Sequence, residues 1–358
     1  MIRDYSQFLP SSGRVKPVVT KPSKLPSLGW QAFFAQQCDL DAQVNTPPVR
    51  VIEVHRNGLH VLGDGIDQLL PPGPEATVGD WLLLDREHPA GSAPLRRKSL
   101  FQRRAPGRER KRQLIAANVD TAFITSSCNK DFNIARLERY VALAFEAEVT
   151  PVIVLTKADL CPDSAPYQQA ALAISSRVIV VTLNALGAEP QERLGDWCRP
   201  GQTVAFLGSS GVGKSTLTNA LTGTQNVETS GIREDDAKGR HTTTRRQLHF
   251  LANGCAVLDT PGMRELQLTD VESGIADLFE DIASLATQCR FTDCRHDSEP
   301  GCAIQAAVKT SEITPERLAR WHKLVAEERF NASTLAERKS DDKALQKRIR
   351  AIQKHKRK

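Results

Sequence analysis

The sequence predicts three folded parts: a small β-barrel, an α/β domain whose parallel sheet carries helices on both faces, and a C-terminal helical part around a metal-binding cluster. Three observations predict this arrangement. Short β-prone segments separated by turn signals occupy residues 46–105. Strand and helix patterns alternate over residues 106–272, as in parallel-sheet domains. Three cysteines and one histidine then fall within residues 289–302.

The overall composition is typical of a multidomain protein without membrane spans. The chain has 358 residues, of which 40% are hydrophobic and 25% charged, and its net charge is +6. This length is enough for two or three domains. No apolar run reaches the length of a membrane span, and the N-terminus lacks a signal-peptide core. We therefore expect a cytoplasmic monomer with no membrane partner.

The barrel follows a loosely basic N-terminal arm, residues 1–45. Strands are expected at 49–54, 58–62 and 80–85, with turn signals between them such as Asn57-Gly58. Their number and spacing fit an OB-type barrel over residues 46–105. A dense basic run, 95–112, adjoins it. This run is either a solvated linker or a nucleic-acid contact, and the neighbouring barrel favours the contact.

The α/β part, residues 106–272, alternates apolar strands with helical stripes. One helical stripe is formed by Leu137, Tyr140, Val141, Ala144 and Phe145. The expected strands span 120–125, 151–155, 178–182, 203–207, 249–251 and 255–259. Alternation of this kind favours a parallel sheet with helices on both faces.

A complete phosphate-binding loop lies inside this part, at residues 208–215 (Gly-Ser-Ser-Gly-Val-Gly-Lys-Ser). It follows an apolar strand and precedes a helical stripe, which is the context that the motif requires. Its glycines allow backbone N–H groups to surround a phosphate chain, and the following helix adds a favourable field. Lys214 is placed to reach the β- and γ-phosphates, and Ser215 to bind Mg²⁺.

Two later segments complete a nucleotide and magnesium site. Residues 259–262 (Asp-Thr-Pro-Gly) follow a strand, so Asp259 can hold the Mg²⁺ shell and the Gly262 N–H can meet the γ-phosphate. Residues 239–244 (Gly-Arg-His-Thr-Thr-Thr) have the composition of a switch segment. One hydroxyl of the run 242–244 would complete the Mg²⁺ shell. The sequence does not distinguish the three, and Thr243 is our candidate.

The choice of base rests on residues 156–159 (Thr-Lys-Ala-Asp). The Asp159 carboxylate can accept hydrogen bonds from guanine N1–H and its exocyclic amine, whereas adenine would leave it unpaired. GTPases usually carry Asn where Thr156 stands, so part of the base contact differs here. The candidate GTP-binding residues are Thr156, Lys157, Ala158, Asp159, Gly208, Ser209, Ser210, Gly211, Val212, Gly213, Lys214, Ser215, Thr216, Asp259 and Gly262.

The order of these motifs is unusual. In ordinary GTPases the base-reading motif follows the phosphate loop, but here residues 156–159 precede residues 208–215. If both serve one site, the domain is a circularly permuted P-loop GTPase domain.

The metal cluster follows in the C-terminal helical part, residues 273–335. Four ligands, from Cys289, Cys294, His296 and Cys302, suit a closed, structural Zn²⁺ site. The alternative is a set of incidental thiols in a reduced protein. A helix is expected to begin at Thr314-Pro315. The final segment, residues 336–358, is a basic tail that is either solvated or bound to a polyanion such as ribosomal RNA.

The permuted order resembles the ribosome small-subunit-dependent GTPase A (RsgA) family, and so do residues 116–120, 208–215, 239–244 and 259–262, the preceding barrel and the Cys/His cluster. The resemblance covers roughly residues 48–330. Thr156, the N-terminal arm and the C-terminal tail depart from it. It implies a GTP hydrolase in late maturation of the small (30S) ribosomal subunit, with subunit-stimulated turnover and rRNA binding. Its cofactors would be a structural zinc ion and Mg²⁺ with GTP.

The group that orients the attacking water is less well defined. Met263 stands where many GTPases carry Gln, so another group must act there. His241 is the candidate catalytic residue beside Lys214, and its alternative role is to contact RNA or pack the switch.

Two other functions fit parts of the sequence. One is an RNA-binding module that uses GTP only as a regulatory ligand. The other is an ATP-using P-loop enzyme, which Asp159 argues against.

Overall fold

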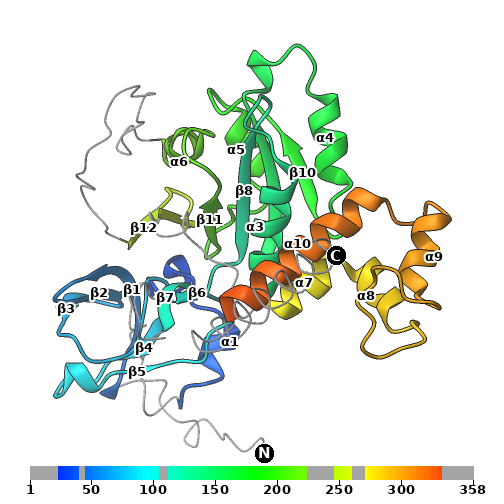
Figure 1. The fold of residues 1–358 in the computed structure, drawn as a ribbon. Helices are drawn as coiled ribbons and strands as arrows, with labels where there is room; N and C mark the ends of the chain where they lie inside the picture. Colours follow the sequence, from blue (N-terminus) through cyan, green and yellow to red (C-terminus); the bar gives the residue numbers. More distant parts are fainter. Residues whose placement is uncertain (1–22, 40–44, 105–111, 224–245, 260–270, 333–358) are drawn as a thin grey trace, which may run out of the picture.

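The computed structural model describes residues 23–39, 45–104, 112–223, 246–259 and 271–332. Its architecture is a long mixed sheet that carries helices around its middle, with a group of helices at one side (Figure 1). No helix within these ranges has the length and apolar character needed to cross a membrane.

The central sheet has the strand order β10-β9-β8-β11-β13-β12. All neighbours are parallel except β12 and β13, which are antiparallel. The strands are β8 (Thr121–Ser127), β9 (Thr150–Thr156), β10 (Ile179–Thr182), β11 (Thr203–Leu207), β12 (Arg246–Phe250) and β13 (Ala256–Asp259). The predicted parallel sheet is therefore confirmed. The strand expected at 249–251 is wrong in its bounds, because β12 begins earlier and pairs with strands on both sides.

Helices cover both faces of this sheet, as alternating strand side chains require. Phe123 and Ile124 of β8 are both fully buried yet belong to two different core clusters, one on each face. The Ile124 face packs under α3, and the Phe123 face packs under α5 and α6. The helices here are α3 (Ile134–Glu146), α4 (Ala165–Leu172), α5 (Glu189–Leu194) and α6 (Lys214–Thr222), with a 3-10 turn η4 (Ala158–Leu160).

The N-terminal strands extend the same sheet. Strand β1 pairs antiparallel with β2 and β4 and also, over two residue pairs, with β12. Strands β6 and β7 form a separate antiparallel pair, which lies on both sides of the predicted boundary between residues 105 and 106. The strands are β1 (Pro48–His55), β2 (Gly58–Gly63), β3 (Ile66–Leu70), β4 (Trp81–Leu83), β5 (Ala93–Pro94), β6 (Leu100–Arg104) and β7 (Arg112–Ala117), with a 3-10 turn η3 (Pro89–Gly91).

A short N-terminal segment is fixed against these strands. It contains η2 (Pro26–Leu28) and α1 (Ala32–Ala35), and Phe34 packs on buried Trp81 at a ring-centroid distance of 5.9 Å. Arg50 lies beneath it, 1% exposed, and donates to the Leu28 carbonyl and to Thr203 Oγ1 at 2.7 Å. Burial lowers the pKa of Arg50 to about 10, although Asp120 and Asp80 oppose this shift. The network joins the N-terminal part to the first residue of β11.

The C-terminal helices pack beside α3. They are α7 (Glu272–Leu278), α8 (Glu280–Ala286), α9 (Ala303–Lys309) and α10 (Pro315–Ala332). Helix α10 begins where Thr314-Pro315 predicted, and the Thr314 hydroxyl accepts from the Arg317 N–H at 3.2 Å. In Figure 1, α10 lies over α3 and α7.

An ion pair between a buried carboxylate and a partly exposed arginine fixes α10 to α3. The Arg320 Nε–H lies 2.9 Å from both carboxylate oxygens of Glu138, which is fully buried. Burial raises the pKa of Glu138, while Arg320 opposes the shift by favouring the charged form. Loss of Arg320 would leave an uncompensated carboxylate in the interior, so the pair fixes the relative position of the two helices.

Candidate functional site

The ends of three parallel strands bring the predicted nucleotide loops together. Thr156 at the end of β9 is paired with Ser127 of β8, and Leu207 at the end of β11 is paired with Ile124 of β8. The base-reading segment leaves β9 and the phosphate loop leaves β11, with only β8 between them. Two segments about fifty residues apart, in reversed order along the chain, therefore meet at one edge of the sheet.

The phosphate loop has the backbone that its glycines permit. Gly208, Gly211 and Gly213 have φ values of +141°, +76° and +95°, in a region that other residues rarely adopt. At Gly208 a Cβ would lie 2.3 Å from the Thr125 carbonyl oxygen, so a side chain there would clash with β8. Helix α6 then begins at Lys214. The predicted strand–loop–helix context is confirmed.

Lys214 folds back onto its own loop. Its Nζ donates to the Gly208 carbonyl at 2.8 Å and also contacts the Ser209 carbonyl. Ser215 and Thr216 follow in the first turn of α6, with their backbone N–H groups at the helix N-terminus. A phosphate group at this position would meet an ammonium group and the helix N-terminus together.

Thr156 joins the base-reading segment to the phosphate loop. Its side chain is fully buried, and its hydroxyl lies 2.7 Å from the Val212 carbonyl and 3.2 Å from the Ser126 carbonyl. Because a hydroxyl has one hydrogen to donate, it is shared between these two acceptors. The hydroxyl at the position usually occupied by Asn is therefore engaged with the protein backbone.

The rest of the base-reading segment projects from this anchor. Lys157 has a left-handed backbone, with φ +58°, and η4 follows immediately. Asp159 lies in η4 and is exposed. Within the described ranges no cation pairs with its carboxylate. The carboxylate is therefore accessible to a base with two adjacent donors.

Several predicted residues lie outside the described part of the chain. These are His241, Thr242, Thr243, Thr244, Gly262, Met263 and the side chain of Asp259. The backbone of Asp259 is described as the last residue of β13, which pairs with β11 in parallel. The Asp259 backbone is therefore next to the strand that leads into the phosphate loop.

The predicted metal ligands come together in the loop between α8 and α9. One ligand atom from each of Cys289, Cys294, His296 and Cys302 lies within 4.8 Å of the others. The Cys289 and Cys302 sulfurs are 3.9 Å apart, and His296 Nδ1 lies 3.5 and 3.6 Å from them. A tetrahedral ion with metal–sulfur bonds of about 2.3 Å and metal–nitrogen bonds of about 2.0 Å would need separations of about 3.8 and 3.5 Å. The donor set and its spacing therefore fit a tetrahedral metal ion.

The loop geometry around these ligands is specific. His296 has φ +62° and Gly301 has φ +78°, so both take left-handed turns. Gln305 Nε2 donates to the His296 carbonyl at 2.6 Å, and the His296 ring lies 5.6 Å from the Trp321 ring of α10. The cluster is thus packed against the long C-terminal helix.

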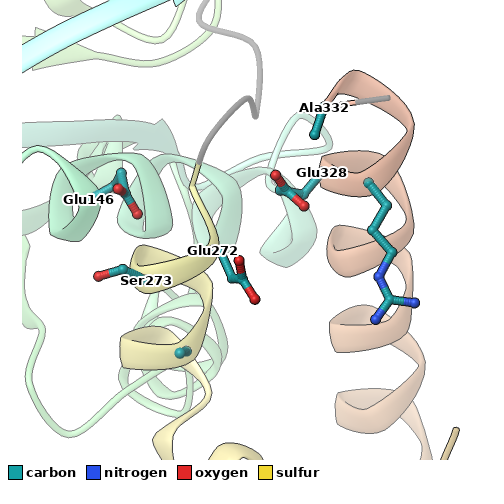
Figure 2. A pocket seen from close by; sticks show the side chains of 7 residues that line it. Glu146, Glu272, Ser273, Glu328 and Ala332 are labelled. Atoms are coloured by element: carbon teal, nitrogen blue, oxygen red, sulfur yellow. The ribbon is translucent and has the colours of Figure 1, made fainter. Parts of the chain in front are cut away.

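A hollow of about 810 Å³ between α3, α7 and α10 is separate from both sites (Figure 2). Glu146, Glu272 and Glu328 contribute three carboxylates to its lining, and Glu146 accepts from the Gly274 N–H at 2.8 Å. Its lining carries these three carboxylates and one guanidinium, that of Arg329, so its net negative charge disfavours phosphates.

One contact at the phosphate loop had no signal in the sequence. Arg136 of α3 donates to the Ser209 hydroxyl at 2.7 Å, although the two residues are 73 positions apart. No motif includes Arg136, and only the fold brings it there.

Family comparisons agree with this geometry. The RsgA GTPase family model matches residues 94–269. An ABC transporter model matches residues 197–346, a range that also contains the phosphate loop. Small ribosomal subunit biogenesis GTPase RsgA 2 of Vibrio parahaemolyticus is 47% identical over 344 residues, covering 95% of this chain and 96% of the relative. The RsgA protein of Mesorhizobium japonicum is 50% identical over 325 residues, covering 88% of this chain and 93% of the relative.

Solved structures show the same fold. YjeQ from Thermotoga maritima matches with a TM-score of 0.58 and 26% identity, over 78% of this chain and 97% of that one. YloQ, described as a circularly permuted GTPase, matches with a TM-score of 0.55 and 22% identity, over 80% of this chain and 96% of that one. The near full-length relatives and the permuted nucleotide loops agree, and the chain belongs to the RsgA family of small ribosomal subunit biogenesis GTPases.

Proposed function

We propose that this GTPase binds the small ribosomal subunit late in its maturation, hydrolyses GTP when the subunit stimulates it, and leaves after hydrolysis. The observation that carries the proposal is the hydrogen bond from Thr156 to Val212, which joins a guanine-reading segment to a phosphate loop in permuted order. Relatives with nearly the same length are named small ribosomal subunit biogenesis GTPases.

Within the nucleotide site we assign roles by chemistry. Lys214 would contact the β- and γ-phosphates, and the Gly262 N–H would meet the γ-phosphate. Asp159 would accept the two guanine donors. Ser215, Thr243 and Asp259 would hold Mg²⁺, which neutralises phosphate charge when bound. His241 is our candidate for orienting the attacking water, with RNA contact as the competing role.

Thr156 would act through the protein backbone. Its hydroxyl is shared between Val212 and Ser126, so its part in GTP binding is to hold Lys157, Ala158 and Asp159 at a fixed distance from the phosphate loop. The phosphate chain would be surrounded by the backbone of the loop from Gly208 to Thr216.

The parts on either side of the GTPase domain would hold the protein on ribosomal RNA. We propose that strands β1–β7 form an OB-type barrel and that the Cys/His cluster binds a single structural zinc ion. Arg96 is exposed within the basic run before β6, whereas its neighbours Arg97 and Lys98 pair with Asp80 and Asp120. Cationic side chains of this kind bind RNA phosphates without sequence preference. We expect the protein to act as a cytoplasmic monomer.

The subunit dependence can be measured directly. We expect GTP turnover to rise at least about tenfold when purified small subunits are added. Binding partners of GTPases often supply or position the groups that stabilise the transition state. Large subunits at the same concentration should leave the rate at its basal value. Equal rates with small, large or no subunits would contradict the proposal. Binding of GTP to the small-subunit complex without turnover would favour an RNA-binding module regulated by GTP.

The metal prediction concerns the zinc ion and the loop that it holds. The purified protein should contain a single zinc ion, and Cys294→Ser should lose it, because a tetrahedral site with three ligands binds far more weakly. Elemental analysis measures the zinc content, and limited proteolysis measures whether the α8–α9 loop becomes accessible to the protease. Cys38→Ser is the matched control, since Cys38 lies outside the cluster. A Cys294→Ser protein with full zinc content would rule the site out.

A further inference from the structure

Arg136 places a cation at the edge of the phosphate loop. Its guanidinium donates to Ser209 Oγ at 2.7 Å, and the side chain is otherwise exposed. Among the described residues no carboxylate pairs with it. The positive charge is therefore not neutralised within the described part of the chain, and it lies where an anionic ligand is expected.

The position of Lys214 shows which end of the phosphate chain Arg136 faces. Lys214 Nζ contacts the carbonyl of the same Ser209 whose hydroxyl Arg136 binds. In phosphate loops of this kind the lysine meets the β- and γ-phosphates. Arg136 and Lys214 therefore both contact Ser209, at the end of the loop that would receive the β- and γ-phosphates.

Local hydrogen bonds hold the backbone around Arg136 at the start of α3. Asn133 caps α3 by accepting from the Arg136 backbone N–H at 3.0 Å. Asn129 Oδ1 accepts from the Ser127 hydroxyl and from the Asp131 N–H, both at 2.9 Å, which fixes the loop before the helix. The next residues, Leu137 and Glu138, are buried. The backbone at Arg136 is therefore held in place, while its exposed side chain is free to take other rotamers.

The reaction at this site requires positive charge. When GTP is hydrolysed, the water oxygen bonds to the γ-phosphorus and the bond from that phosphorus to the β–γ bridging oxygen breaks. The water protons pass to inorganic phosphate and solvent, and negative charge develops on the γ-phosphoryl and bridging oxygens. An arginine supplied from the same chain can stabilise this charge. Met263 cannot substitute for it, because a thioether carries no charge and is a poor hydrogen-bond partner.

We propose that Arg136 is such a residue: when GTP binds, its guanidinium moves from Ser209 Oγ to the γ-phosphate and stabilises the transition state without transferring a proton. This inference rests on the proposed GTPase site and adds a catalytic residue to it. The contact with Ser209 is then the resting position of the side chain in the absence of nucleotide.

The test compares variants of the full-length protein, first without subunits and then with small subunits added. Arg136→Ala should lower kcat for GTP at least about tenfold while KM changes less than about threefold, because the missing contact is made mainly in the transition state. Arg136→Gln should lose as much, since its amide keeps a hydrogen-bond donor on this side chain but carries no charge. Guanidinium ion at millimolar concentration should restore part of the Arg136→Ala rate.

The matched control is Arg139→Ala. It removes the same charge one turn along α3, where Arg139 pairs with Glu327 of α10, and it should keep the basal kcat. Wild-type kcat in Arg136→Ala would overturn the proposal, and so would full activity in Arg136→Gln, which would make the residue a tether for the loop. Loss of subunit-stimulated turnover alone, with normal basal kcat, would identify an RNA contact and equally overturn it.

The outcome separates this inference from the proposed function. If the wild-type protein hydrolyses GTP and Arg136→Ala matches it, only the role of Arg136 fails. If the wild-type protein does not hydrolyse GTP with or without small subunits, the proposed function fails first.

Discussion

Lys214→Ala should lower GTP turnover by about 10²–10³-fold, the cost of removing one preorganised contact to developing charge. Lys214 Nζ lies on the carbonyls of Gly208 and Ser209, directly over the loop that would hold the phosphates. Alanine favours the helix, so α6 should still begin at this position. Single-turnover kinetics with saturating GTP measures the loss.

The first control is to show that the Lys214→Ala protein still folds. The thermal unfolding temperature should stay within a few degrees of the wild-type value, because Lys214 is only partly buried and its Nζ bonds to carbonyls of its own loop. Lys323→Ala, an exposed lysine of α10, should keep full turnover. A well-folded Lys214→Ala protein with normal turnover would show that catalysis takes place somewhere other than this loop.

Asp159→Asn should exchange the base that the site accepts. The asparagine amide would direct a donor at the guanine exocyclic amine, leaving that pair unmatched at a cost of about 1–3 kcal/mol, or roughly 5- to 150-fold in affinity. Xanthine carries a carbonyl at the same carbon, so the amide would donate to it. Calorimetric titration with GDP and with xanthosine diphosphate measures both changes.

A matched substitution isolates the effect. Asp196→Asn changes an exposed aspartate that lies 3.3 Å from the Arg199 guanidinium, and it should alter neither affinity. If Asp159→Asn binds GDP as the wild-type does, Asp159 does not contact the base. The permuted site would then need a different base-reading residue, and the place of Thr156 beside the phosphate loop would need another explanation.

Local patterns were sufficient to predict the central sheet. Strands β8, β9 and β11 are fully or almost fully buried, so their apolar runs show both their presence and their parallel pairing. The phosphate loop was equally clear, because glycines at 208, 211 and 213 occupy backbone conformations that other residues avoid. The Cys/His cluster was predicted from the chemistry of four ligands close together in sequence.

Elements held mainly by distant partners were not predictable. Strand β3 has an exposed middle, with three of its five residues facing solvent, so it lacks the apolar signal of the buried strands. The start of β12 at Arg246 depends on its pairing with β1, nearly two hundred residues earlier. The Glu138–Arg320 pair joins residues 182 positions apart, and nothing near Glu138 indicates a buried charge.

The same limit applies inside the nucleotide site. The sequence showed that Thr156 replaces the usual asparagine, but only the fold shows its hydroxyl on the Val212 carbonyl. Arg136 reaches Ser209 for the same reason. Contacts between single residues of two loops depend on where the neighbouring strands end relative to each other. Those end points depend on the pairing of the whole sheet, which no local pattern contains.

The most direct test of the permuted site is a crystal structure of the protein with GDP and Mg²⁺. The Asp159 carboxylate should lie within hydrogen-bonding distance of guanine N1 and its exocyclic amine, while Lys214 contacts the β-phosphate of the same nucleotide. Thr156 should keep its hydrogen bond to Val212. A nucleotide whose phosphates occupy residues 208–215 while its base lies away from Asp159 would contradict the claim that the two segments form one site.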